Sequence, residues 1–194
     1  MSGLAARILN NAPREFALGG LSMGGIVAME MVRQAPDRIA GLALLDTNPL
    51  AEAEEVRARR APQIKRARAG HLDSVMRDEM KPNYLCDGEN KTEILDLCMD
   101  MAMDLGPDVF CDQSAALRDR PDQTDTLRKY DKPTLVLCGR EDRLCPISRH
   151  ELLHQLLPRS NLVIIDGAGH MPTLEKPVET SRALGRWLKD VDDE

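Results

Sequence analysis

The sequence predicts an α/β protein in which a mostly parallel sheet has helices on both faces and carries an inserted helical cap. Short apolar runs alternate with helical patterns at both ends of the chain, and this alternation is typical of parallel sheets. The run Ile39–Leu45 is apolar throughout, as a parallel strand covered on both faces should be. The long segment between the second and third predicted strands shows helical patterns only, which indicates an insertion.

Residues 1–47 form the first predicted part of the core. An apolar pattern at helical spacing stops before Pro13, and a second one stops by Pro36. The second pattern is apolar nearly all round its first turns, so its helix should be buried against the sheet. The expected elements are, in order, a helix over Gly3–Asn11, a strand over Phe16–Leu18, a helix after Ser22 that includes Ile26 to Val32, and a strand over Ile39–Leu45.

Residues 48–130 form the predicted cap. Asn48 and Pro49 have the residue types of an N-cap and a first helical position, so we expect a helix to begin there. Pro62 should split or kink that helix, because proline removes a backbone donor and clashes with the preceding turn. Further helical patterns cover Leu72–Met80, Thr92–Leu105 and Asp112–Leu127.

The apolar stripe of Thr92–Leu105 is rich in methionine and has two interpretations. Its residues recur at helical spacing and would form the core of the cap. Methionine side chains are also flexible enough to line an adaptable apolar pocket. On this second interpretation Met99 and Met103 contact the substrate.

Residues 131–194 form the second predicted part of the core. Because the insertion follows the second strand, the cap should lie over the carboxyl ends of the strands, where open α/β sheets bind ligands. The expected elements are strands over Pro133–Cys138 and Leu162–Ile165 and helices over Ile147–Leu157 and Pro177–Leu188.

The composition is that of a folded globular domain. The chain has 194 residues, of which 42% are hydrophobic and 30% charged. Its 26 basic and 32 acidic residues give a net charge of -6, which argues against nucleic acid as a partner. Aromatic residues make up only 3%, so no platform for stacking bases is expected, and the arginines of the first cap helix should form a solvated face.

The cysteines and the chain start predict the compartment. The cysteine count is odd and no Cys-x-x-Cys pair occurs, so we expect free thiols in a reducing compartment. No motif in the sequence implies a metal or an organic cofactor, and none is expected. No signal-peptide pattern opens the chain, and no apolar run reaches the roughly 20 residues that a membrane span needs. We therefore predict a cytoplasmic protein that does not bind membranes. The five cysteines are Cys86, Cys98, Cys111, Cys138 and Cys145.

One short motif, Gly20-Leu21-Ser22-Met23-Gly24, lies between a predicted strand and a predicted helix. In a nucleophile elbow the serine takes a strained positive-φ turn between such elements, which exposes its hydroxyl at the sheet edge. Asp142 and His170 follow later predicted strands. Imidazole, with an ordinary pKa of about 6.5, can take the serine proton, and a carboxylate can orient the imidazole. The three residues therefore predict nucleophilic catalysis.

Other residues compete for these positions. Asp46 also ends a strand, but we favour Asp142 as the acid and expect Asp46 to tether the start of the cap. Cys145 has no base in register, so a structural thiol is expected there. The remaining histidines lie on helical segments, where surface histidines are usual: His71, His150 and His154.

Three stretches resemble the α/β-hydrolase superfamily, and specifically its esterase-like members with a helical cap after the sixth strand. They are Gly20–Gly25, Pro133–Pro146 and Gly167–His170. The resemblance implies that Ser22 is the nucleophile, Asp142 the acid and His170 the base, and that the backbone N–H of Met23 is one donor of the oxyanion hole. It covers almost the whole chain, although the cap is similar only in position and helicity.

The sequence departs from the family at its start. Family members begin with four more strands and a first helix, and one loop there carries a His-Gly oxyanion stretch. We therefore expect the strand Phe16–Leu18 to have a free edge. Two expectations follow: Met1 is an internal methionine of a longer protein, or a homodimer covers the edge.

The predicted function is that of a serine hydrolase that cleaves a small ester or related acyl compound through an acyl-enzyme. Thioesterases and carbon–carbon bond hydrolases use a similar triad, so both stay open as alternatives. An impaired fragment or a binding module of the same fold is a further alternative, because only one oxyanion donor is identified, and losing one donor costs roughly 10²–10³ in rate.

Overall fold

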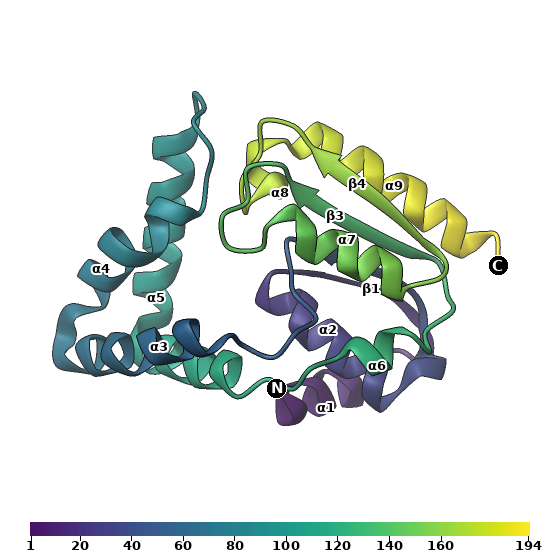
Figure 1. The fold of residues 1–194 in the computed structure, drawn as a ribbon, viewed down its shortest axis with the longest axis horizontal. Helices are drawn as coiled ribbons and strands as arrows, with labels where there is room; N and C mark the ends of the chain where they lie inside the picture. The colour runs from purple at the N-terminus through teal and green to yellow at the C-terminus, as the bar shows by residue number, and fades with distance from the viewer.

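The computed structural model describes residues 1–194 and shows a four-stranded sheet in the order β1-β2-β3-β4, with every neighbouring pair parallel (Figure 1). The predicted α/β class with a parallel sheet is therefore confirmed. The first strand is longer than the predicted Phe16–Leu18. The strands are β1 (Phe16–Leu21), β2 (Ile39–Leu45), β3 (Thr134–Gly139) and β4 (Ser160–Ile165).

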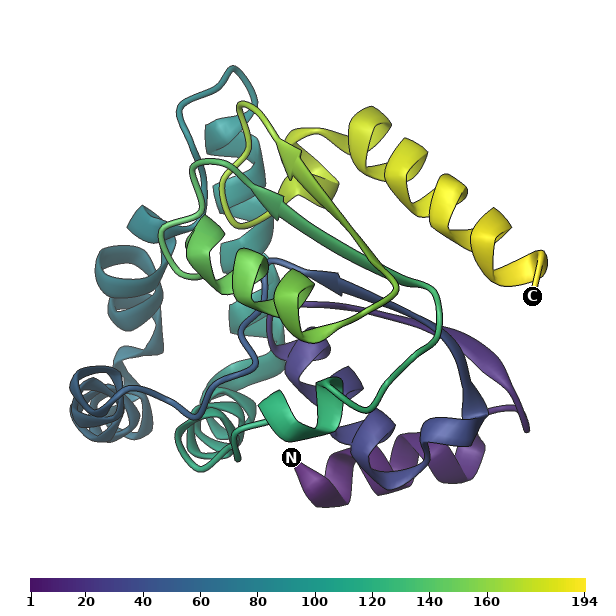
Figure 2. The same cartoon turned by 45° about the vertical axis from the view of Figure 1, so that its right-hand side comes forward.

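Helices cover both faces of the sheet, as Figure 2 shows with α9 on one side and the N-terminal helices on the other. One face carries α1 (Ser2–Asn11), α2 (Met23–Gln34), α6 (Thr124–Leu127) and α7 (Ile147–Leu156), with the short turn Pro36–Arg38 leading into β2. The other face carries α9 (Pro177–Asp192), which the short helix α8 (Pro172–Glu175) precedes.

The core has two halves because the central strands are apolar on both faces. On the side of α2 and α7, Leu42, Leu44 and Val136 pack together. On the side of α9, Leu45 and Leu137 pack with Trp187, and these belong to the second half. This double coverage explains why β2 is a continuous apolar run in the sequence.

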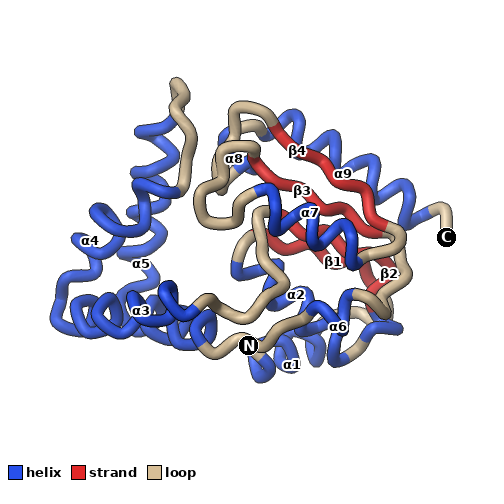
Figure 3. The backbone as a smooth tube through the Cα atoms, viewed as in Figure 1, coloured by secondary structure: helices blue, strands red, loops and turns tan.

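The cap lies to one side of the sheet and contains helices and loops only (Figure 3). Its main helices are α3 (Glu54–Arg66), α4 (Leu72–Val75) and α5 (Lys91–Arg118). Wider helical turns, Ala67–His71 and Met76–Met80, connect them, and the turn Lys81–Asn83 follows.

Three local predictions for the cap are wrong. The first helix does not begin at Asn48: the Asn48 side chain accepts the N–H of Leu50 in a tight turn instead. Helix α3 continues through Pro62, and the chain bends at Gly70, where φ is 90°. The predicted helix over 92–105 and the first part of the one over 112–127 are joined in one helix, α5, which is kinked at Gly106 with φ 78°. The rest of the second predicted helix is interrupted around Pro121 and ends in α6 (Thr124–Leu127).

The chain returns to the core earlier than the predicted boundary at residue 130. Leu127 and Tyr130 are buried in the core cluster on the face of α2 and α7. The Tyr130 hydroxyl donates to the Ile39 carbonyl at 3.1 Å, which fixes this segment to β2. Helix α6 therefore belongs to the core, and the cap ends before it.

Both outer strands of the sheet, β1 and β4, have a free edge, because each pairs with one neighbour only. Strand β1 pairs with β2 alone, and Ala17 and Gly19 are exposed in an alternating pattern along it. Helix α9 contacts β2, β3 and β4.

None of the helices combines the length and hydropathy that a membrane-spanning segment needs.

Candidate active site

Ser22 lies in a sharp turn between β1 and α2. Its φ of 51° and ψ of -115° place it in a conformation that L residues rarely adopt. The Ser22 N–H donates to the Leu45 carbonyl at 2.9 Å, which fixes the turn to the end of β2. A Cβ on Gly20 would lie 2.3 Å from the backbone of Gly24, so only glycine fits there. The turn has the geometry that the sequence motif predicts.

The side chains of Ser22, His170 and Asp142 form one hydrogen-bonded chain. The distance from His170 Nε2 to Ser22 Oγ is 2.8 Å, and that from His170 Nδ1 to Asp142 Oδ2 is also 2.8 Å. A carboxylate can only accept, so Nδ1 carries the proton and Nε2 presents its lone pair to the Ser22 hydroxyl. His170 and Asp142 are 4% and 5% exposed, so little water competes for these bonds.

The turn after β3 holds Asp142. Its Oδ1 accepts the N–H of Leu144 at 2.8 Å and the N–H of Cys145 at 3.0 Å. Because Oδ1 is engaged by the main chain, Oδ2 is the oxygen that faces His170. The carboxylate is thus oriented by its own loop.

The loop that carries His170 is bound to the cap. The His170 N–H donates to the Tyr84 carbonyl at 2.7 Å, and the two rings lie 6.2 Å apart between centroids. A Cβ on Gly169 would lie 2.8 Å from the same carbonyl, so the close approach requires glycine. The Glu175 carboxylate accepts N–H groups from both segments, those of Cys86, Gly169 and Met171.

Neither Tyr84 nor Glu175 is predicted from the sequence. Glu175 lies in the four-residue helix α8, where it looks like an ordinary surface acid. Its contacts reach 89 residues back along the chain to Cys86, and no local pattern could reveal them.

Asp46 occupies the end of β2 with a φ of 43° and no exposed surface. Its Oδ1 accepts the N–H of Gly139 at 2.9 Å, so it connects β2 to β3. We expected Asp46 to tether the start of the cap, but the hydrogen bond of its carboxyl goes to β3 instead. The pKa of Asp46 is raised to about 9, mainly by burial and in part by the nearby Asp142, against the lowering effect of the Gly139 N–H.

The prediction that His150 is a surface residue is wrong, since it has no exposed surface. Its Nε2 accepts the N–H of Thr47 at 3.0 Å, and the Thr47 hydroxyl donates to the Ser22 carbonyl at 2.8 Å. Burial lowers the pKa of His150 to about 4, so the ring stays neutral and can accept. His150 therefore fixes the backbone of Ser22 indirectly, through Thr47.

The two methionines proposed to line a pocket are four residues apart on α5 and share one face of it, but they differ in burial. Met99 packs partly buried against the cap's own core, and Met103 is 46% exposed. Ile94 and Cys98 pack against Met171 and Leu174 of the loop after His170. Along its length, the same side of the helix also carries exposed apolar side chains: Leu97, Met101 and Leu105.

Met23 is the first residue of α2, where backbone N–H groups have no acceptor inside the helix. Its N–H follows Ser22 directly, at the positive end of the helix dipole. Its role as an oxyanion donor stays a prediction.

One group of potential metal ligands surrounds the same loop. The ligand atoms of Asp142, Cys145 and His170 lie within 4.8 Å of one another. Burial raises the pKa of the Cys145 thiol, which disfavours the thiolate that a metal would need. Asp142 and His170 are already bonded to each other, so the arrangement fits proton transfer better than metal binding.

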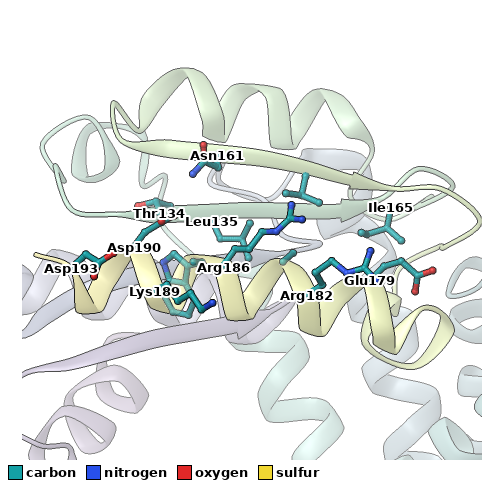
Figure 4. Close-up of a pocket in the computed structure, with 13 residues that line it drawn as sticks. Thr134, Leu135, Asn161, Ile165, Glu179, Arg182, Arg186, Lys189, Asp190 and Asp193 are labelled. Carbon is teal, nitrogen blue, oxygen red and sulfur yellow. The ribbon is translucent and has the colours of Figure 1, made fainter.

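Two grooves lie outside the Ser22 region. One of about 760 Å³ lies between β3, β4 and α9, and Figure 4 shows its mixed lining of Arg182, Arg186 and Glu179. The other, of about 340 Å³, is lined by the loop around Cys86 and by Glu175. Neither contains Ser22 or His170.

Comparison with known proteins connects this geometry to a family. A sequence model described as "Alpha/beta hydrolase family" matches residues 2–183. A thermophilic esterase from Thermogutta terrifontis is 32% identical and superposes with a TM-score of 0.88, over 98% of this chain and 70% of that one.

Curated relatives are more distant. The pimeloyl-[acyl-carrier protein] methyl ester esterase of Neisseria meningitidis serogroup B is 26% identical over 89% of this chain and 67% of its own length. The biotin biosynthesis bifunctional protein of Teredinibacter turnerae is 24% identical over 95% of this chain, which spans only 34% of that protein.

Proposed function

Because the chain belongs to the alpha/beta hydrolase family, we propose that it is a serine esterase with Ser22 as nucleophile, His170 as base and Asp142 as acid. The observation that carries the proposal is the continuous hydrogen-bonded chain from Ser22 Oγ through His170 to Asp142, with 2.8 Å at each step. The serine at one end of this hydrogen-bonded series lies in a positive-φ turn at the carboxyl end of a strand. Esterase-type homologues support the same reaction class.

The three side chains are arranged to acylate Ser22 and then to release the acyl group. Ser22 Oγ attacks the ester carbonyl while His170 Nε2 takes its proton. Asp142 keeps Nδ1 protonated and stabilises the imidazolium that forms. His170 then gives the proton to the departing alcohol, and an acyl-Ser22 ester remains. A water molecule then attacks the carbonyl of acyl-Ser22 while His170 accepts its proton. His170 returns this proton to Ser22 Oγ as the bond to the acyl group breaks, and the acid is released.

The negative charge of the tetrahedral intermediate needs donors. The N–H of Met23, at the first position of α2, is the donor that this chain supplies next to Ser22. The N-terminal end of the α2 dipole adds a favourable field there.

The substrate class that we propose is an ester of an apolar acyl group with a small alcohol. The exposed apolar side chains of α5 lie on the side of that helix that packs on the loop after His170. Relatives that are named as esterases of a pimeloyl-[acyl-carrier protein] methyl ester fit an acyl substrate of this kind. Thioesters and carbon–carbon bonds remain alternative substrates. Rates on an oxygen ester and a thioester of the same acyl group distinguish an esterase from a thioesterase.

The test is hydrolysis of a series of 4-nitrophenyl esters. We expect turnover that Ser22→Ala reduces by at least about 10³-fold, because removal of the nucleophile leaves only binding and oxyanion stabilisation. Ser181→Ala, on the exposed side of α9, is the matched control and should act like the wild type. Equal rates in the wild type and Ser22→Ala would exclude the proposal.

Two observations favour a second candidate. Strand β1 has a free edge, and a single backbone donor beside Ser22 has been identified. A binding module or an impaired hydrolase that keeps the three side chains would show these features. It would bind esters without turning them over, so ester binding with no Ser22-dependent hydrolysis would favour it.

A further inference from the structure

Asp46 is a buried carboxyl group that the proposed mechanism does not use. It has no exposed surface, and its Oδ1 accepts a single N–H, that of Gly139. No donor reaches its Oδ2. A buried carboxylate oxygen without a donor is strongly unfavourable, so an ionised Asp46 does not fit this site.

Asp46 and Asp142 meet at Gly139: its N–H donates to Asp46 Oδ1 at 2.9 Å, and its carbonyl accepts the Asp142 N–H at 3.3 Å. The Asp142 carboxyl is one of the groups that raise the pKa of Asp46. Both oxygens of Asp142 are already occupied as acceptors. Oδ1 receives the N–H groups of Leu144 and Cys145, and Oδ2 receives Nδ1–H of His170. Two neighbouring buried carboxyl groups cannot both be ionised. Asp142 has three donors and Asp46 has one, so the shared proton resides on Asp46.

We propose that Asp46 is a protonated carboxylic acid at neutral pH and that it donates a hydrogen bond to Asp142, as a positioning residue for the Asp142–His170 pair. Its donor supplements those of the Asp142 loop and restrains rotation of the carboxylate that His170 uses. The catalytic consequence rests on the function proposed above, whereas the protonation of Asp46 does not.

The groups around Asp46 determine in which direction kcat changes with pH. The pKa of Asp46 is raised to about 9, mainly by burial and in part by the carboxylates of Asp142 and Glu175. The other titratable neighbours are the thiols of Cys138 on β3 and Cys145 after it, whose pKa values burial also raises. Above about pH 9 Asp46 ionises, its hydrogen bond is lost and it repels Asp142. We expect kcat to fall in that range.

The test compares pH–rate profiles of the wild type, Asp46→Asn and Asp46→Ala. Asparagine keeps a donor for Asp142 but cannot ionise, so Asp46→Asn should retain most of kcat at pH 7 and lose the alkaline decline. Alanine has no donor, and we expect kcat to fall about 10- to 100-fold with little change in KM. Asp37→Asn, at an exposed acid, is the charge-matched control and should keep the wild-type decline.

A second measurement does not need activity. Infrared spectra at pH 7 should show the C=O stretch of a protonated carboxylic acid that Asp46→Asn removes. Thermal unfolding should agree: folded Asp46 holds a proton that the unfolded chain releases near pH 4, so wild-type stability falls as pH rises toward 9, and Asp46→Asn escapes this fall.

The outcomes separate the two proposals. An absent infrared band, or an alkaline decline of kcat that persists in Asp46→Asn, would overturn the role of Asp46. A loss in Asp46→Asn as large as that in Asp46→Ala would overturn it too, because the charge would then be what matters. A band without Ser22-dependent hydrolysis would leave Asp46 protonated and contradict the esterase proposal instead.

Discussion

The site at the strand ends and the cap helix α5 hold their side chains in opposite ways. At the strand ends, the main-chain N–H groups of Ser22 and His170 donate to carbonyls of β2 and of the cap, and the His170 side chain is almost fully buried. On α5, Met101 and Leu105 are 56% and 55% exposed, and the helix is kinked at Gly106.

This difference separates two properties of an enzyme. Reacting groups must be held within a narrow geometry, and backbone bonds to a buried sheet provide that. Groups that contact a variable acyl chain can be flexible, and exposed methionine and leucine side chains on a helix are suited to it. Changes at the strand ends should therefore affect folding and kcat, and changes on α5 should affect KM and substrate preference.

The largest effect is expected for Gly20→Ala. Its Cβ would lie 2.3 Å from the backbone of Gly24, and neither segment can move without disturbing Ser22. We expect a loss of about 1–3 kcal/mol of stability, seen as a lower Tm, together with loss of ester hydrolysis.

Gly24→Ala is the matched control, because nothing lies within 4 Å of a Cβ built there. Alanine in a helix is favoured over glycine by roughly 0.5–1 kcal/mol, so Tm should hold or rise. An equal loss of Tm in both variants would show that the tight turn is not the cause.

A smaller effect is expected for Met101→Gln. A polar amide on the apolar side of α5 should weaken binding of an apolar acyl group by about 1 kcal/mol, which is roughly a fivefold rise in KM, with kcat little changed. The effect should grow with the length of the acyl chain across the 4-nitrophenyl ester series.

Met103→Gln provides the comparison on the same helix. At 100° per residue Met103 points away from Met101, and it is similarly exposed at 46%. KM should stay at the wild-type value. Equal changes in the two variants would remove the distinction between the sides of α5 and with it the proposed acyl contact.

The sequence reveals the strand-end residues because their signals are local. Ser22 has a glycine two residues before it and another two residues after it, and Asp142 and His170 each follow an apolar run with a glycine in between. Parallel pairing then brings the carboxyl ends of all four strands to one edge. The core strands and the α/β class could be predicted for the same reason.

The supporting contacts are not visible in the sequence because they join distant segments. His150 is buried against Thr47, which is 103 residues away, so its helical position suggested a surface residue. Helix α3 continues through Pro62, and α5 continues with a kink through Gly106 and Pro107, although local propensity disfavours a helix at all three. The partners of Glu175 are hidden in the same way.

Covalent labelling of Ser22 tests the central claim most directly. A fluorophosphonate reacts with a serine only where a neighbouring base activates the hydroxyl, and it reports that activation even where turnover is slow. Peptide mass spectrometry should locate a single adduct on Ser22, and His170→Gln, which disrupts the hydrogen bond to Ser22 Oγ, should prevent its formation. An unlabelled chain, an adduct on another residue, or equal labelling of His170→Gln would contradict the account.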